Sequence, residues 1–409
     1  MSLSCWVPGA NGSGFPAEHL PYGVFVEDAS SVQTPPRVGV RIGDQVLDLA
    51  RLAGEGLVEG PFDQPSLNPF MAEGPLRWQE VRERLTELVC DPRLSARVGP
   101  ALLRVDQVRL FRPFTVADYV DFYSSLEHAT NLGRLFRPDG DPLLPNWRHL
   151  PVGYHGRSGT IVVSDTPVVR PQGQRREPDG TVVFGPSTRL DIELEVGFVV
   201  GVASAPHLPV PIDEAPSHVF GVVLVNDWSA RDIQAWEYQP LGPFLGKSFA
   251  TSVSAWVTPL DALAGCRTTG PVQEPTPLPY LTAAEDWALA LDLAVDMTPA
   301  GSDRSETISS TSFAGLYWRF PQQLAHLTVN GAHLRTGDLI ASGTVSGPTP
   351  GSEGSLVELT RGGAEPLTVV GVGRRFLEDG DEIVLRGQAD VDGVTITLGE
   401  VRGRILPAL

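Results

Sequence analysis

Short segments in which apolar and polar residues alternate dominate the chain, and this pattern is typical of β-strands. In the N-terminal part we expect strands at residues 22–27, 37–49 and 102–111. Gly43-Asp44 interrupts the second segment at a position typical of a hairpin turn. One helix is expected to begin at Pro75, because the apolar residues after it recur at helical spacing: Trp78, Val81, Leu85 and Leu88.

The character of the sequence changes after Arg112-Pro113, where we expect a domain boundary. A chain of 409 residues favours two domains, and we assign residues 1–114 to the first and 115–409 to the second. Residues 116–135 are predicted to be helical. Residues 137–159 form a long loop, and a loop of this length in a compact domain is usually functional.

Strand-like segments return through most of the second domain. They are expected at residues 160–169, 190–202, 218–225, 287–296, 337–342, 355–359 and 382–398. Only two or three helices are expected, including residues 229–238 and 313–327. Because strands and helices do not alternate regularly, a doubly wound α/β sheet is disfavoured. The pattern predicts a mostly β, α+β fold with a mixed sheet.

Composition narrows the classes of function. The net charge of -18 argues against nucleic-acid binding, which needs a positive surface. Three cysteines far apart match neither a disulfide framework nor a zinc pattern, so we expect a reducing compartment. The first basic residue is Arg37, which leaves no positively charged signal segment, and the apolar runs are too short to cross a membrane. We therefore expect a cytoplasmic protein with neither nucleic-acid nor membrane partners.

Lys247 is the only lysine of the chain, and every other basic residue is arginine. Lysine differs from arginine in offering a compact charge with an adjustable pKa. Its survival at one position indicates a site that needs a point charge, although a lysine on a solvated surface fits the composition too. It lies in the segment 226–251, which also contains Asp227 and Arg231.

Carboxylates gather in two further patterns. In 190–196 a strict alternation would place Asp191, Glu193 and Glu195 on one strand face, where they repel one another without a positive partner. A solvated edge strand explains this segment equally well. Asp227 follows an apolar strand whose end would be buried, and Asp121 lies between aromatic residues. Together these oxygens would suit Ca²⁺ or Mg²⁺ and not Zn²⁺.

His128 lies seven residues after Asp121, about two turns along a helix, so the imidazole would overlook such a metal. Histidine suits the activation of water at neutral pH, although most histidines are structural. Residues 242–248 resemble a phosphate-binding P-loop but have one residue too few between the glycines. No G-x-S-x-G motif is present to supply a serine nucleophile.

Several long motifs resemble the fumarylacetoacetase family. They are DFYSS at residues 121–125, HATN at 128–131, LPNWRHLPVGYHGR at 144–157, ELE at 193–195, NDWSARDIQAWEYQPLGPFLGKS at 226–248, SGT at 342–344 and ILPA at 405–408. The resemblance implies a small N-terminal Src-homology-3-like β-barrel, a larger catalytic domain with a mixed β-sheet roll, and a homodimer. It also implies hydrolysis of the carbon–carbon bond of 4-fumarylacetoacetate to fumarate and acetoacetate, the last step of tyrosine and phenylalanine catabolism.

The same resemblance implies the site residues. A divalent ion, Ca²⁺ in the first place, would be bound by Asp121, Glu193, Glu195 and Asp227. A second or replacing ion, Mg²⁺, would lie near Asp227, Lys247 and Thr251. His128 would be the base, Glu358 would orient it, and Arg231, Gln234 and Lys247 would form the electrophilic side of the pocket. The implied contacts of the diketo-acid substrate are Tyr123, Arg137, Tyr154, Gln234, Tyr238 and Thr344.

Two other functions remain open from the sequence. A related acylpyruvate hydrolase or oxo-acid decarboxylase would keep the metal ligands and the lysine, but characteristically lacks the N-terminal domain and the DFYSS…HATN segment. A calcium-stabilised binding protein would use the same carboxylates without catalysis. The motifs favour the fumarylacetoacetate hydrolase.

Overall fold

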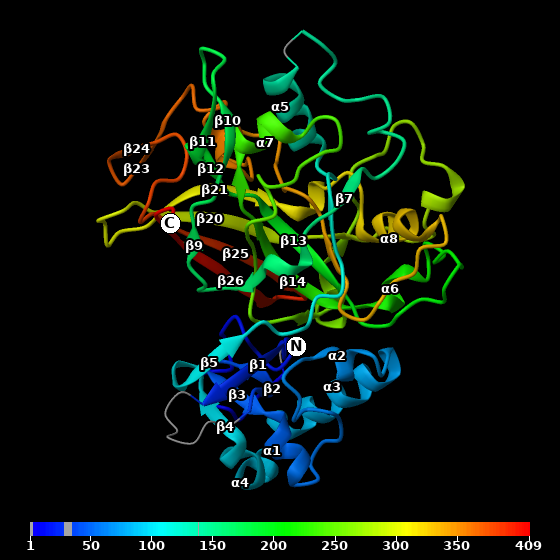
Figure 1. Cartoon of the computed structure of the whole chain (residues 1–409). Helices are drawn as coiled ribbons and strands as arrows, with labels where there is room; N and C mark the ends of the chain where they lie inside the picture. Colours follow the sequence, from blue (N-terminus) through cyan, green and yellow to red (C-terminus); the bar gives the residue numbers. More distant parts are fainter. Residues whose placement is uncertain (1–2, 28–34, 138) are drawn as a thin grey trace.

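The computed structural model describes residues 3–27, 35–137 and 139–409, and it divides into two β-rich parts (Figure 1). The N-terminal part is drawn in blue and cyan below the larger C-terminal part. Among the described residues, no helix is long and apolar enough to cross a membrane. The mostly β architecture predicted from the alternating pattern is confirmed.

The N-terminal part is a five-stranded antiparallel sheet with helices beside it. The strands follow the order β4-β3-β2-β1-β5, so β4 and β5 form the two edges and the sheet is an open half-barrel. They are β1 (Tyr22–Glu27), β2 (Arg37–Ile42), β3 (Gln45–Asp48), β4 (Leu102–Arg104) and β5 (Val108–Phe111). The helices are α1 (Leu49–Gly54), α2 (Asn68–Met71), α3 (Pro75–Cys90) and α4 (Ser95–Val98). The predicted helix is α3, whose apolar residues are buried.

A central mixed sheet carries the C-terminal part. Its order is β7-β6-β22-β13-β14-β16-β8, with β17 also paired to β14. The strands are β6 (Tyr119–Phe122), β7 (Gly153–His155), β8 (Ile161–Val163), β13 (Leu194–Val200), β14 (Val219–Asp227), β16 (Thr251–Val253), β17 (Thr258–Pro259) and β22 (Leu339–Ala341). Two pairs, β6 with β22 and β8 with β16, are parallel, which makes the sheet mixed.

A second sheet follows the order β21-β20-β25-β26-β9. Its strands are β9 (Val168–Val169), β20 (Asp292–Thr298), β21 (Glu306–Ser312), β25 (Glu382–Val391) and β26 (Val394–Leu406). Short strand pairs lie outside the two sheets: β10 (Gln172–Arg176) with β11 (Val182–Pro186), β12 (Leu190–Asp191) with β15 (Ser229–Ala230), β18 (Arg267–Thr268) with β19 (Ala288–Leu289), and β23 (Leu367–Val369) with β24 (Val372–Arg374). The helices are α5 (Leu126–Phe136), α6 (Ala215–His218), α7 (Arg231–Glu237), α8 (Phe320–Thr328) and α9 (Leu356–Leu359).

β14 is buried along its whole length because it is covered on both faces. Val222 and Leu224 belong to the core shared with the second sheet, whereas Val223 and Val225 pack with the core of the N-terminal part. Successive side chains of a strand point to opposite faces, so a strand between two cores must be apolar at every position. This explains the uninterrupted apolar run before Asp227.

Several predicted elements differ from the structure. Residues 116–135 are not one helix, because β6 precedes α5 and only the second half is helical. Residues 355–359 were expected to be a strand, but they contain the short helix α9. The segment 190–202 is broken between β12 and β13, and the expected helix at 313–327 begins only at Phe320. Sequence alternation also missed β10 and β21, whose residues are largely exposed and polar, and the short β11, whose residues are apolar but largely exposed.

Candidate active site

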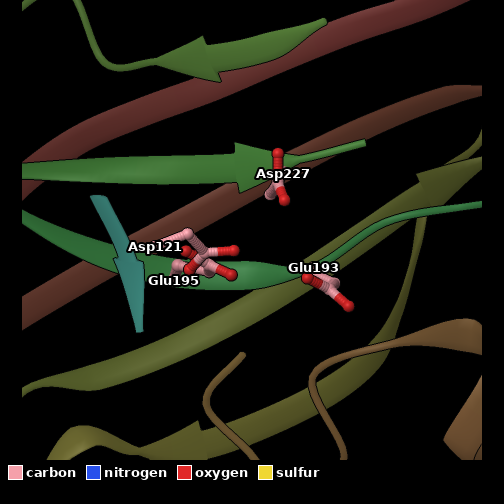
Figure 2. A group of neighbouring side chains, drawn as sticks. All are labelled: Asp121, Glu193, Glu195 and Asp227. Atoms are coloured by element: carbon pink, nitrogen blue, oxygen red, sulfur yellow. The ribbon is translucent and has the colours of Figure 1, made fainter. Parts of the chain in front are cut away.

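Four buried carboxylates meet at one end of the central sheet (Figure 2). Asp121, Glu195 and Asp227 come from β6, β13 and β14, and Glu193 directly precedes β13. One oxygen of each residue lies within 4.8 Å of the corresponding oxygens of the others. The three strand residues share a sheet face by the two-residue period, since Tyr119, Val199 and Val225 on that face pack with the N-terminal core. The predicted metal ligands are thus brought together.

These carboxylates fit a divalent cation. In the described part of the chain, no donor contacts Asp121 Oδ1 or either carboxylate oxygen of Glu195. Burial and the neighbouring negative charges raise the pKa of Asp121 and Glu195 well above the usual range. Carboxylate oxygens without donors are costly inside a protein unless a cation balances them. An all-oxygen site is the kind that hard divalent cations prefer.

Lys247 lies beside the cluster and is 6% exposed. Its Nζ donates to Glu193 Oε2 and, at 2.9 Å, to Asp227 Oδ2. Burial alone would lower the pKa of Lys247, but the two carboxylates outweigh it and raise that pKa. Thr251 Oγ1 donates to the other oxygen of Asp227 at 2.8 Å. The lysine is therefore a charged donor between two carboxylates, and one of its three N–H groups remains available.

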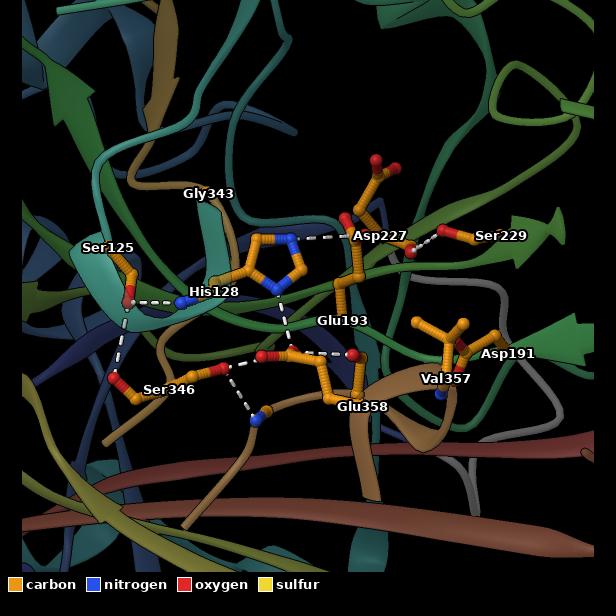
Figure 3. Close-up of polar contacts among 12 residues, drawn as sticks. Ser125, His128, Asp191, Glu193, Asp227, Ser229, Gly343, Ser346, Val357 and Glu358 are labelled. Atoms are coloured by element: carbon orange, nitrogen blue, oxygen red, sulfur yellow. Dashed lines mark hydrogen bonds and ion pairs between the residues drawn. The ribbon is translucent and has the colours of Figure 1, made fainter. Parts of the chain in front are cut away.

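His128 and Glu358 form a buried pair next to the cluster (Figure 3). His128 Nδ1 lies 2.6 Å from Glu358 Oε2, and its Nε2 lies 3.9 Å from Glu193 Oε1. Burial would raise the pKa of Glu358, but His128 and hydrogen bonds to the carboxylate outweigh it and lower that pKa. An ionised Glu358 accepts a hydrogen bond from Nδ1–H, which leaves the lone pair on Nε2, the nitrogen that faces the carboxylate cluster.

Arg231 and Gln234 lie on α7, one turn apart. The Arg231 guanidinium contacts Glu193 Oε1 through Nη2 at 2.8 Å and donates through Nη1 to Gln234 Oε1 at 3.2 Å. Burial would lower the pKa of Arg231, but Glu193 and Asp191 outweigh it and raise that pKa. The guanidinium of Arg231 contacts the same carboxylate as Lys247, and together with the amide of Gln234 it adds donors beside Glu193.

Known proteins resemble the chain over its whole length. Residues 18–112 match the fumarylacetoacetase N-terminal family, and residues 118–406 match the fumarylacetoacetate (FAA) hydrolase C-terminal family. The fumarylacetoacetase of Rattus norvegicus is 46% identical, with 99% of each chain covered, and that of Caenorhabditis elegans is 47% identical, with 97% of each covered.

The chain belongs to the fumarylacetoacetase family.

Solved structures of low sequence identity share the fold of this fumarylacetoacetase family member. A fumarylacetoacetate hydrolase from Exiguobacterium antarcticum is 19% identical with a TM-score of 0.54, covering 95% of this chain and 99% of that one. A maleylpyruvate hydrolase from Sphingobium is 17% identical with a TM-score of 0.51, covering 95% of this chain and all of that one. The two-part family architecture is therefore present, and the family's metal dependence agrees with the buried cluster.

A cavity of about 490 Å³ opens onto the fumarylacetoacetase site. Its lining comes from the loop 137–159, from the segment after α7 and from the strands β6 and β14, and includes Tyr154, Arg157, Phe244, Lys247, Tyr119 and Asp227. Tyr154 OH donates to Asp227 Oδ2 at 3.3 Å, and the ring of Tyr123 meets His128 edge-on at 5.3 Å between centroids. Described residues of the long loop, such as Tyr154 and Arg157, thus lie at the site.

The remaining residues predicted to contact substrate differ in how close they lie to the carboxylate cluster. Thr344 is buried, and its Oγ1 has no partner among the described residues. Arg137 follows α5 and donates through Nη2 to Pro142 O at 2.6 Å. Tyr238 lies after α7, is 41% exposed, and has no contact with the cluster in the described part of the chain. A contact between Tyr238 and substrate remains a prediction.

One expected neighbour of the cluster is elsewhere. The alternation in 190–196 placed Asp191 with Glu193 and Glu195, but the chain leaves the strand geometry between β12 and β13. Asp191 instead pairs with Arg231, 2.8 Å from its Nε. The equally weighted solvated edge strand is wrong too, since all three carboxylates are buried.

Sequence reasoning also missed the residues around Glu358. Asn131 Nδ2 donates to Glu358 Oε1 at 3.0 Å, and Ser346 and Ser355 donate to Oε2 at 3.0 and 2.6 Å. Asn131 carries a signal in the sequence, because it lies three residues after His128 and therefore on the same helix face. The two serines have no such signal, since each lies on an irregular segment.

Proposed function

We propose that the chain hydrolyses the carbon–carbon bond of 4-fumarylacetoacetate to fumarate and acetoacetate, as the last step of tyrosine and phenylalanine catabolism. The observation that carries the proposal is the buried His128–Glu358 pair with its free imidazole nitrogen beside four carboxylates. Whole-length identity to proteins named fumarylacetoacetase supports the choice of substrate.

In the proposed reaction His128 is the general base. Because Glu358 accepts a hydrogen bond from Nδ1–H, the proton stays on Nδ1 and Nε2 can take a proton from water. The resulting hydroxide attacks the carbonyl carbon of the fumaryl group, which becomes a carboxylate carbon of fumarate, and forms a tetrahedral oxyanion. As that intermediate collapses, the carbon–carbon bond breaks and its electron pair leaves with acetoacetate as an enolate. The imidazolium of His128 returns its proton to the enolate carbon.

The oxyanion needs donors that are already in place. The third N–H of Lys247, the guanidinium of Arg231 and the amide of Gln234 are held near the cluster by their contacts with Glu193, Asp227 and one another. Preorganised donors of this kind each contribute about 3 kcal/mol to transition-state stabilisation. Tyr123, Arg137, Tyr154, Tyr238 and Thr344 are proposed to bind the remainder of the substrate.

We propose that Ca²⁺ is bound by Asp121, Glu193, Glu195 and Asp227, and that Mg²⁺ can replace it or lie near Asp227, Lys247 and Thr251. A bound divalent cation would act as a Lewis acid and a template for the dicarbonyl of the substrate. Asp121 Oδ1 and both carboxylate oxygens of Glu195, which no donor contacts in the described part of the chain, support a cation at the first position. A dianionic substrate in a protein of net charge -18 requires such local positive charge.

A cytoplasmic homodimer with a domain boundary at residue 114 completes the proposal. The gap between the two family matches supports the boundary. The dimer is supported by exposed apolar side chains concentrated in one segment: Trp236, Leu241, Phe244 and Leu245. Light scattering of the purified protein tests it, and a monomeric mass at micromolar concentration would contradict it.

The substrate assay tests the function. The absorbance of freshly prepared 4-fumarylacetoacetate should fall when the protein is added. A chelator should stop this decrease, and excess Ca²⁺ should restore it. No consumption of this substrate together with cleavage of an acylpyruvate would assign the related hydrolase. A shift in melting temperature on chelation with no diketo acid consumed would assign a binding protein.

A further inference from the structure

Asp191 joins the two halves of the site without belonging to the carboxylate cluster. Its side chain is fully buried at the end of β12. Oδ2 accepts from Arg231 Nε at 2.8 Å and from Val357 N at 3.0 Å, and Oδ1 accepts from Ile192 N at 2.8 Å and from Leu356 N at 2.7 Å. Each oxygen therefore has two donors, and three of the four come from segments far from Asp191 in the sequence.

The first half that Asp191 holds is the oxyanion side. With Nε bound to Asp191, the planar guanidinium of Arg231 can present only its two terminal nitrogens to the site. Those nitrogens contact Glu193 and Gln234. A carboxylate on Nε thus fixes both the position and the plane of the guanidinium.

The second half is the general-base side. The N-terminal N–H groups of a helix need acceptors, which a side chain at the N-cap usually supplies. Ser355 at the N-cap of α9 accepts no such bond, and its hydroxyl donates to Glu358. Asp191 accepts from Leu356 N and Val357 N in its place, and Figure 3 shows Asp191 beside Val357. The turn that carries Glu358 is therefore anchored on the same carboxylate as Arg231.

We propose that Asp191 is a positioning residue that fixes the distance between the Arg231 guanidinium and the His128–Glu358 pair. It touches neither substrate nor the reacting atoms. One group must stabilise the oxyanion while the other moves the proton, and both must meet a single substrate. The inference rests on the proposed hydrolysis for its kinetic test, and it has a second test that does not.

A buried ion pair can also be purely structural, and the chain offers a matched control for that alternative. Asp381 is equally buried and accepts from Arg374 Nε and Nη2 at 2.9 and 3.0 Å. It also accepts from Glu378 N and Ala300 N, each at 2.8 Å. Asp191→Asn and Asp381→Asn thus remove the same kind of charge from the same kind of contacts, but only the first lies at the site.

The kinetic test compares melting temperature, kcat and KM of the two variants on 4-fumarylacetoacetate. Both should lose similar thermal stability. Asp191→Asn should lower kcat by about 10- to 100-fold with little change in KM, since misplacement of about 1 Å costs up to ~10²-fold in rate. Asp381→Asn should keep kcat within about twofold of the parent. Equal kcat in the two variants would overturn the proposal.

The second test is independent of turnover. In ¹⁵N-labelled parent protein, the Nδ1 proton of His128 should give a low-field NMR resonance because it bridges 2.6 Å to Glu358. Asp191→Asn should shift or broaden this resonance, and Asp381→Asn should not. If the parent protein does not consume 4-fumarylacetoacetate but Asp191→Asn still shifts the resonance, only the proposed substrate is refuted. An unchanged resonance in Asp191→Asn would refute the positioning role. If Asp191→Asn does not fold, Asp191→Glu replaces it, and parental kcat together with a parental resonance would overturn the role.

Discussion

Replacing Lys247 by methionine removes the only lysine charge from the centre of the site. The substitution keeps an unbranched side chain, shorter by the terminal nitrogen, but leaves Glu193 and Asp227 without the ammonium that contacts both. Since Lys247 and both partners are almost completely buried, water cannot take its place. Breaking a buried ion pair by removing one partner costs about 3–5 kcal/mol.

The expected change in melting temperature follows from the size of the chain. The entropy of unfolding is ~2.1 cal/mol/K per residue, or about 0.9 kcal/mol/K for 409 residues. A loss of 3–5 kcal/mol therefore lowers the melting temperature by about 4–6 °C. Because the cluster also becomes more negative by one charge, excess Ca²⁺ should stabilise Lys247→Met more than the parent. The loss of one oxyanion donor should lower kcat by about 10²–10³-fold.

Calorimetry with and without Ca²⁺ and steady-state kinetics measure these effects. The matched control is Arg386→Met, which breaks an ion pair with Asp296 whose arginine is half exposed. An exposed pair contributes about 0–1 kcal/mol, so this variant should melt within about 1 °C of the parent. Equal melting temperatures and equal kcat for the two variants would refute the reasoning about Lys247.

Four further outcomes are expected. Lys247→Arg keeps the charge but not its compact shape, so kcat should fall at least tenfold in a folded protein, and parental activity would contradict this. Glu358→Gln should lower kcat by about 10²–10⁴-fold, since His128 loses the acceptor for its Nδ1 proton, while metal content by atomic emission stays unchanged. Calcium at about 100 times its Kd should stabilise the parent by about 2.7 kcal/mol, and Glu195→Gln should lose most of this in a thermal titration. Burial lowers the pKa of His19 from 6.5 to about 3. Between these pH values the unfolded chain binds a proton that the folded one does not, so the free energy of unfolding falls as pH falls from 6.5 towards 3, by about 2 kcal/mol at pH 5. In His19→Gln, the free energy of unfolding from denaturant titrations should therefore depend less steeply on pH.

The metal ligands could be predicted because their local chemistry is unusual. Asp227 ends a strand that is apolar at every position, and a carboxylate there needs a partner wherever the strand is buried. His128 lies beside the carboxylates as predicted, but not for the predicted reason of helical spacing from Asp121. Asp121 lies on β6 and His128 on α5, so helical spacing does not connect them; the turn between strand and helix does.

Other parts of the site depend on contacts between distant segments, which no local pattern encodes. Glu358 was expected on a strand, because alternation over five residues cannot distinguish a strand from one helical turn. Asp191 shares the alternation of Glu193 and Glu195, yet it leaves their face where the chain turns between β12 and β13. Only the folded chain shows that its donors come from α7 and α9.

The double burial of β14 limits how the protein can be divided. Phe220 packs within 6 Å, between ring centroids, of Tyr22, Phe70 and Trp78 of the N-terminal part. Tyr22 and Val257 also exchange two backbone hydrogen bonds across the junction. A catalytic fragment beginning at residue 115 would expose this aromatic surface directly behind the strand that ends in Asp227. The N-terminal part thus covers one face of the strand that carries Asp227, and truncation should yield an insoluble fragment and not a minimal enzyme.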